Sequence, residues 1–236
     1  MKIVESTDFY LRVVMFDFKH PDKNIKLSFR ILPMFHIGTK KYYNSVMEKL
    51  SECDEILYEG FNFKKIRFQS QQFKRIAKKL NLTTQMERVN LKKLNKTLTH
   101  SDLTTQQANS LWKNLSINEK FKFLIHDPIK LHYFSYSLNR KKLAKNFTTA
   151  AKEQMLAYGP RFDEEGTAEN LIMNEREKIL LQILGSRFHR QKCFDKKIGI
   201  IYGAGHMKRI VRYIIDQLGY ISKHAEFLEV YPILES

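Results

Sequence analysis

The segment 198–218 constrains the fold of this chain more than any other. The apolar run Ile198–Tyr202 predicts a buried strand, and the glycine-rich turn Gly203–His206 follows it directly. Apolar residues then recur at helical spacing over Met207–Leu218. This order of strand, tight turn and helix is typical of an α/β sheet, in which ligands bind beyond the carboxyl ends of the strands. His206 is therefore expected where an imidazole can bind a metal or move a proton.

Two further strand patterns open the chain. Apolar residues dominate Phe9–Phe18 and Ile25–Phe35, and the turn residues His-Pro-Asp-Lys-Asn occupy positions 20–24 between them. This arrangement predicts an antiparallel hairpin. Because Pro33 has no backbone N–H, pairing should lapse on one side of the second strand at that point.

A helical pattern over Tyr43–Cys53 connects the second strand to a short strand, Glu55–Gly60. Parallel strands that are joined through a helix place their carboxyl ends at the same edge of a sheet. His36 follows the first of these strands and Glu59 ends the second, so both side chains are expected at that edge.

The middle of the chain, from about residue 64 to 177, reads as mostly helical. Helical patterns cover Phe68–Leu80, Thr105–Leu115, Leu143–Leu156 and Ala168–Leu184, with a loop at Tyr158–Gly166, and a last strand is expected at Glu226–Ile233. Strands therefore flank a helical insert. The sequence predicts one α/β domain over residues 1–236, with a mixed β-sheet core, flanking helices and this insert.

The chain is strongly basic, with 41 Lys and Arg against 25 Asp and Glu and a formal net charge of +16. Such a charge attracts anionic partners. The cations are spread over many segments and no nucleic-acid-binding motif accompanies them, so specific binding of nucleic acid is disfavoured but stays open.

Several protein classes are disfavoured by what the sequence lacks. Cys53 and Cys193 form no Cys-x-x-Cys motif, which excludes a cysteine zinc site and predicts free thiols in or near the core. No apolar run is long enough to span a bilayer, and the N-terminus shows no apolar core of a signal peptide. A cytoplasmic location is expected.

Three side chains that follow predicted strands form the main candidate site: His36, Glu59 and His206. Two imidazoles and one carboxylate are a common ligand set for zinc or manganese, and an open coordination position would activate water. Each residue alone also has a structural interpretation, as a hydrogen-bonded strand-end histidine or a turn glutamate. Arg176, in a helical segment, could pair on the surface or stabilise developing negative charge.

Gly203-Ala204-Gly205 also resembles a dinucleotide-binding loop. Lys208 stands where the third glycine of that fingerprint is required, and no second strand–helix unit with a ribose-binding acid follows. Nucleotide binding is therefore disfavoured.

The ordered motifs together resemble the TraB/PrgY/GumN family, which is related to the Tiki metalloproteases and more distantly to erythromycin-esterase-like and ChaN-like proteins. The resemblance covers nearly the whole chain. The motifs that carry it are His36-Ile37-Gly38-Thr39, Tyr42-Tyr43, Glu55–Gly60, Asn174-Glu175-Arg176 and Tyr202–His206. Gln85 and His100-Ser101-Asp102 fall where family members carry a Gln and a His-Ala-Asp stretch. Of the two Gly-x-x-His motifs that describe the family, the second is intact, whereas Pro33 replaces the glycine of the first.

The resemblance implies a bacterial metal-dependent hydrolase, with a peptidase as one form, acting on a peptide or small molecule. His36, Glu59 and His206 would hold manganese, cobalt or zinc. Glu59, Arg176 and His206 would act in catalysis, supported by Gly203, Gly205, His100, Asp102 and Gln85. A non-catalytic peptide or ligand binder of the same fold, a basic anion binder and a homo-oligomer all stay open.

Overall fold

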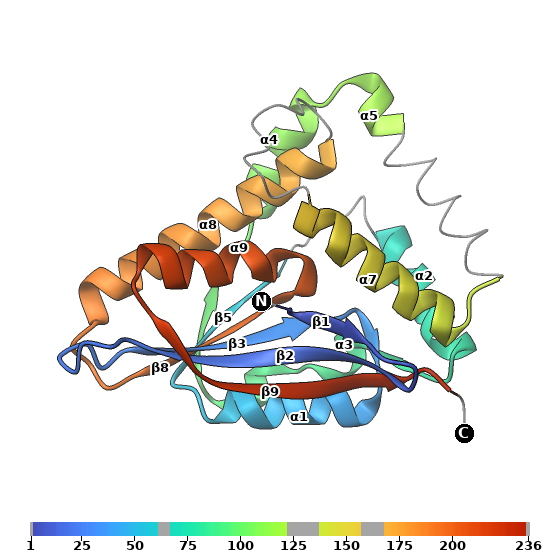
Figure 1. The fold of residues 1–236 in the computed structure, drawn as a ribbon. Coiled ribbons are helices and arrows are strands. Elements are labelled where there is room, and N and C mark those ends of the chain that lie inside the picture. Colours follow the sequence, from blue (N-terminus) through green and yellow to red (C-terminus); the bar gives the residue numbers. More distant parts are fainter. Residues whose placement is uncertain (1, 61–66, 122–136, 157–167, 235–236) are drawn as a thin grey trace.

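The computed structural model describes residues 2–60, 67–121, 137–156 and 168–234, without the side chains of residues 67–70, 149–156 and 168–172. Seven strands of this part of the chain form a mixed sheet in the order β1-β2-β3-β8-β5-β7, with β9 paired to β2 (Figure 1). They are β1 (Val4–Ser6), β2 (Tyr10–Lys19), β3 (Ser28–Met34), β5 (Glu55–Tyr58), β7 (Thr97–His100), β8 (Lys197–Gly203) and β9 (Ile221–Pro232). The predicted α/β fold with a mixed sheet is confirmed.

Helices lie on both faces of this sheet. Figure 1 shows α1 below the sheet and α8 and α9 above it. The helices of the described residues are α1 (Lys40–Ser51), α2 (Arg67–Lys79), α3 (Gln85–Arg88), α4 (Thr105–Asn114), α5 (Ile117–Phe121), α7 (Arg140–Leu156), α8 (Ala168–Gln191) and α9 (Met207–Arg212). Short helical turns occupy Leu91–Leu94, Ala204–His206 and Tyr213–Gln217, and a separate small sheet joins β4 (Ile37–Gly38) to β6 (Thr83–Thr84).

The strand order decides which residues meet. β3 and β5 are parallel, as predicted, but they are not neighbours, because β8 lies between them and pairs in parallel with both. β7 adds a fourth parallel strand beside β5. It comes from the middle of the chain, where the sequence analysis expected mainly helices. All four parallel strands thus end at one edge of the sheet.

The antiparallel half of the sheet follows the predicted hairpin. β2 pairs with β3 from Lys19↔Ser28 to Phe16↔Ile31, and β9 lies along the other side of β2. Beyond Ile31, β3 pairs only with β8, so pairing lapses on the β2 side before Pro33, as predicted. The predicted loop at Tyr158–Gly166 lies outside the described residues.

Each face of the sheet carries its own hydrophobic cluster, which the alternation in β2 illustrates. Leu11, Val13 and Met15 pack in the cluster on the α1 face, whereas Val14, Phe16 and Phe18 pack in the cluster under α8 and α9. Because successive side chains of a strand point to opposite faces, one strand can serve both clusters.

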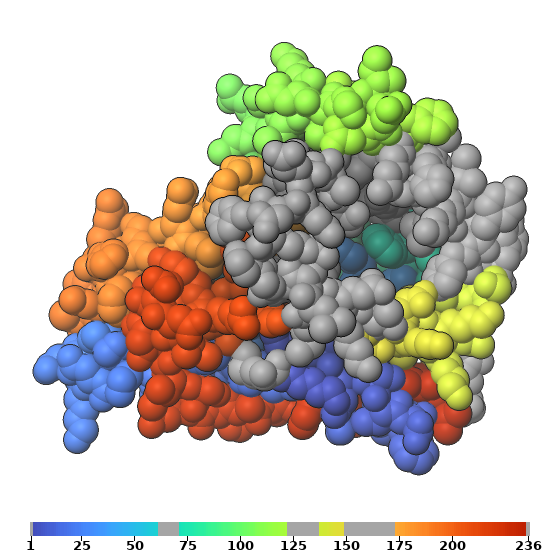
Figure 2. Space-filling model, turned by 45° about the horizontal axis from the view of Figure 1, so that its top comes forward, coloured from blue at the N-terminus to red at the C-terminus, as the bar shows by residue number. Residues whose placement is uncertain are grey.

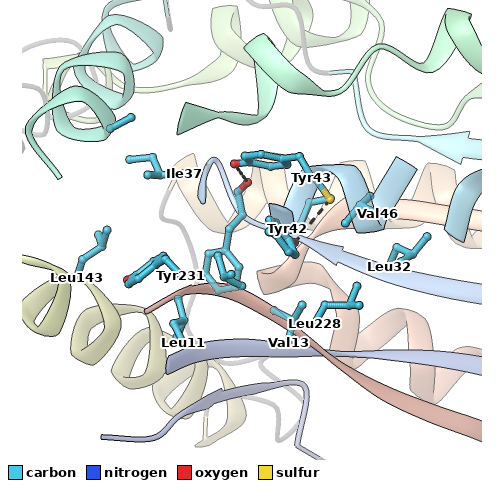
Figure 3. Close-up of a cluster of buried hydrophobic side chains, with 14 of the residues drawn as sticks. Leu11, Val13, Leu32, Ile37, Tyr42, Tyr43, Val46, Leu143, Leu228 and Tyr231 are labelled. Carbon is cyan, nitrogen blue, oxygen red and sulfur yellow. Dashed lines mark hydrogen bonds between the residues drawn. The ribbon is translucent and has the colours of Figure 1, made fainter. Parts of the chain in front are cut away.

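Two tyrosines of α1 hold the segment that leads to His36. The Tyr42 hydroxyl donates to the carbonyl oxygen of Pro33 at 2.6 Å, and the Tyr43 hydroxyl donates to that of Phe35 at 3.0 Å. Figure 3 shows both rings inside the α1-face cluster, with the Tyr43 bond dashed. Both side chains are fully buried, so the backbone before His36 is tied to a rigid core.

Cys53 and Cys193 are both free thiols, as predicted. Cys53 is buried, as expected, but the predicted place of Cys193 in or near the core is wrong, because Cys193 lies in the exposed turn between α8 and β8. Within the described ranges, no helix combines the length and apolar character that crossing a membrane requires.

Gly199 offers a test of the packing between β8 and α1. A Cβ at this position would lie 3.0 Å from Cys53 Sγ and 3.1 Å from Leu50 Cδ2. Gly199→Ala should therefore lower the free energy of unfolding, measured in urea, by about 1–3 kcal/mol. In Gly199→Ala/Cys53→Ala, removal of the sulfur should make the combined loss smaller than the sum of the single losses. Additive losses would show that this contact does not limit the packing.

Candidate active site

The predicted site residues follow neighbouring parallel strands. His36 comes after β3, Glu59 after β5, Asp102 after β7 and His206 after β8. His36 interacts electrostatically with Glu59, Arg176 and His206, so these side chains lie near one another. The structure thus brings together the residues that the sequence analysis selected from distant parts of the chain.

Arg176 of α8 connects two of these strand ends. Its Nε donates to Asp102 Oδ1 at 2.9 Å and its Nη2 to Asp102 Oδ2 at 3.0 Å, which is a bidentate ion pair. Nη2 also donates to Glu59 Oε1. Arg176 and Asp102 are both buried. A guanidinium held by two carboxylates is well placed to fix their positions.

Glu59 is ionised at neutral pH. Burial alone would raise the pKa of this carboxyl, but the charge of Arg176 and the N–H of Gly203 outweigh that effect and hold the pKa below its usual value. The Gly203 N–H donates to Glu59 Oε2 at 2.6 Å. A Cβ on Gly203 would lie 3.2 Å from that oxygen, so the glycine allows the carboxylate to approach the backbone of β8 closely.

His36 is surrounded by protein atoms but still exposed to solvent. Its ring lies against Phe73 at a centroid distance of 4.9 Å, and the nearby Gln85 side chain contributes to the pKa of the imidazole by raising it. Loss of hydration lowers the pKa of His36 more than Glu59 raises it, which favours the neutral imidazole. A side chain that has many protein atoms around it and still contacts solvent is typical of the lining of a concave surface. Figure 2 shows a hollow on the face that carries α4, α7 and α8, with blue and teal atoms on its floor.

His206 has a different environment from His36, because it is buried. Its Nδ1 lies 3.0 Å from Glu177 Oε1, and its ring meets the ring of Tyr202 edge-on at 5.3 Å. Arg209 of α9 donates from Nη1 to Glu177 Oε2 at 2.9 Å. The sequence analysis did not select Glu177. Its position next to Arg176 on one helix is the signal that could have identified it.

The remaining predicted residues lie around the candidate site, and several of them contact backbone groups there. Asp102 Oδ2 accepts from the Gly60 N–H at 3.2 Å, and a ring nitrogen of His100, Nε2, lies 3.1 Å from the Gly60 carbonyl oxygen. His100 is exposed, and Gly205 is half-buried in the turn before α9. Gln85 donates its N–H to the carbonyl of His36 at 3.0 Å. These contacts tie β4, β5, β7 and α3 to the candidate site.

The donor atoms do not fit a preformed metal centre. Among the described residues, no three His, Cys, Asp or Glu side chains are placed to hold one ion. Both oxygens of Glu59 are engaged, by Arg176 and by Gly203, and His206 Nδ1 is engaged by Glu177. The metal that the resemblance implies therefore enters no step below.

Comparisons of the chain with models of known families, with curated proteins and with solved structures gave no match. The resemblance to the TraB/PrgY/GumN family therefore stays a prediction.

Arg176→Met should destabilise the protein in a pH-dependent way. Removing one partner of a buried ion pair costs about 3–5 kcal/mol at pH 7. Without Arg176, burial would raise the pKa of Glu59, so the folded variant would bind a proton that the unfolded chain releases. The difference in free energy of unfolding between wild type and Arg176→Met, measured in urea, should therefore become smaller as the pH falls from 7 to 5.

Arg187→Met is the matched control. Arg187 also pairs with a buried carboxylate, Glu55, but Lys196 and Thr99 keep their bonds to Glu55 in this variant. Arg187→Met should therefore lose less free energy of unfolding than Arg176→Met does. A deficit of Arg176→Met that stays constant or widens on acidification would contradict the assigned role of Arg176.

Proposed function

We propose that this protein is a hydrolase whose active site is the edge formed by the carboxyl ends of β3, β5 and β8. One observation carries the proposal: two imidazoles, His36 and His206, share this edge with the ionised carboxylate of Glu59. Ligand and catalytic sites of α/β sheets form at such edges. A neutral imidazole beside a fixed negative charge is suited to general-base catalysis.

In the proposed reaction, the oxygen of a water molecule attacks an acyl carbon while one imidazole takes the proton of that water. Glu59 stabilises the imidazolium electrostatically. The C–N or C–O bond then breaks, and the imidazolium returns the proton to the leaving group. Arg176 acts indirectly, because its Nε and Nη2 donors are bonded to Asp102 and Glu59. Its proposed role is to hold Glu59 in place.

Peptides and small acyl compounds are the proposed substrate class, which is supported by the resemblance to the TraB/PrgY/GumN family, a relative of the Tiki metalloproteases. A divalent metal is a separate element of this proposal. For an ion to bind, the Glu59 carboxylate would have to lose its hydrogen bond from Arg176 or from Gly203.

Direct measurement of bound metal tests that element. Wild type, His36→Ala and His206→Ala would be incubated with manganese, cobalt or zinc, desalted and analysed for metal content. A resident ion needs both imidazoles, so retention of about one equivalent by wild type alone would establish the metal. Equal, negligible retention in all three proteins would remove the metal from the proposal and leave the imidazole mechanism.

Hydrolysis itself is tested with a panel of peptide, ester and amide substrates. His36→Gln, His206→Gln and Glu59→Gln should each be compared with wild type. Loss of the proton-accepting imidazole should reduce kcat by roughly 10²–10⁴-fold. Glu175→Gln is the matched control, because Glu175 pairs with Lys178 at 2.5 Å on the exposed side of α8. Activity that survives in all three site variants would contradict the proposal.

A non-catalytic ligand-binding protein is the second candidate. It is favoured by the observation that Arg176 already pairs with both Glu59 and Asp102, as in a structural ion-pair network. Absence of turnover across the panel, together with ligand binding that His36→Gln abolishes, would support this candidate.

A further inference from the structure

Glu177 is a deeply buried carboxylate beside the candidate site. It is 1% exposed and its partner His206 is 3% exposed. Its two oxygens serve different partners, since Oε1 lies 3.0 Å from His206 Nδ1 and Oε2 accepts from Arg209 Nη1 at 2.9 Å. Arg209 also donates to Asn174 Oδ1 at 3.1 Å, one turn before Glu177 on α8. Each oxygen of the Glu177 carboxylate is thus held by a different side chain.

This arrangement determines which nitrogen of His206 carries a proton. An ionised carboxylate only accepts hydrogen bonds, and a guanidinium only donates them. The contact between Oε1 and Nδ1 is a hydrogen bond only when Nδ1 carries the hydrogen. The neutral ring then has its lone pair on Nε2.

The opposite edge of the ring is turned toward the proposed reaction centre. Nδ1 faces Glu177, whereas Cδ2 lies 3.5 Å from the Cβ position of Gly203, which itself lies 3.2 Å from Glu59 Oε2. Nε2 is bonded to Cδ2, and in the part of the chain that the structure describes no hydrogen bond joins it to another residue. The lone pair is therefore on the side of the ring away from Glu177.

We propose that Glu177 is the positioning residue of this site, and that it selects His206 as the proton-accepting imidazole by fixing the Nδ1–H tautomer. The catalytic consequence rests on the proposed hydrolase function, whereas the tautomer does not. A carboxylate that orients a histidine in this way is a recurrent device of general-base catalysis.

Glu177→Gln gives a sharp test because an amide has only one acceptor oxygen. Arg209 cannot accept a hydrogen bond, so the amide oxygen should turn to Arg209 and the NH₂ group to His206. Nδ1 must then accept, and the ring should switch to the Nε2–H tautomer with little change in shape. Glu177→Gln/Arg209→Ala removes this constraint, so the oxygen can face Nδ1 and the Nδ1–H tautomer should return.

The readout is a long-range ¹H–¹⁵N correlation spectrum of the full chain with ¹⁵N-labelled histidine. The His206 signals are assigned by their loss in His206→Gln. Wild type and the control Glu175→Gln should show Nδ1–H, and Glu177→Gln should show Nε2–H. An Nε2–H tautomer in wild type, or an unchanged Nδ1–H tautomer in both Glu177→Gln and Glu177→Ala, would overturn the inference.

This experiment needs no substrate, so its failure is separate from failure of the proposed function. The expected tautomers without turnover on the substrate panel would refute the hydrolase and leave the assignment of Glu177 standing. Where turnover is found, Glu177→Gln should lower kcat by about 100-fold or more while KM changes little, because the wrong tautomer removes the base and not the binding surface. An unchanged kcat in a variant with the switched tautomer would show that His206 is not the proton acceptor.

Discussion

The ion pair between Arg176 and Asp102 is the interaction on which the candidate site depends. It anchors α8 to the end of β7, and through Nη2 the same guanidinium holds Glu59 at the end of β5. Glu59 in turn accepts from the backbone of β8 at Gly203. One buried cation therefore connects three strand ends and sets the charge of the Glu59 carboxylate. Without such a partner, a carboxylate buried at this edge would favour its neutral form.

The second constraint is the position of β8. This strand comes last among the parallel strands in sequence, yet it lies between β3 and β5, which are joined directly through α1. Its insertion places the turn that carries His206 between the strand ends that lead to His36 and Glu59. It also places Gly203 where its N–H meets the Glu59 carboxylate. The residues of the first seventy positions therefore form only part of a site, and the C-terminal third completes it.

Much of this could be predicted from local patterns. The apolar segments 9–18 and 25–35 and the turn at 20–24 predicted the hairpin, and helical spacing predicted α4 over residues 105–115. Strand ends also identified His36, Glu59 and His206 as candidates. Two features had no such pattern. Thr97–His100 is too short and too polar to be read as a strand, and forms one because β5 offers it an unpaired neighbour. Glu177 resembles a surface residue of a charged helix, and its burial against His206 depends on how α8 packs on α9.

Local chemistry alone thus determined the α/β class, the antiparallel hairpin and the residues that could react, because hydrophobic periodicity and turn propensity act over a few neighbouring positions. The tertiary structure decided the strand order, the partners of Arg176 and the pairing of His206 with Glu177. These depend on contacts between residues 29 to 144 positions apart. The same long-range contacts explain why three residues that suggest a metal centre in the sequence meet an arginine and a second glutamate in the folded chain.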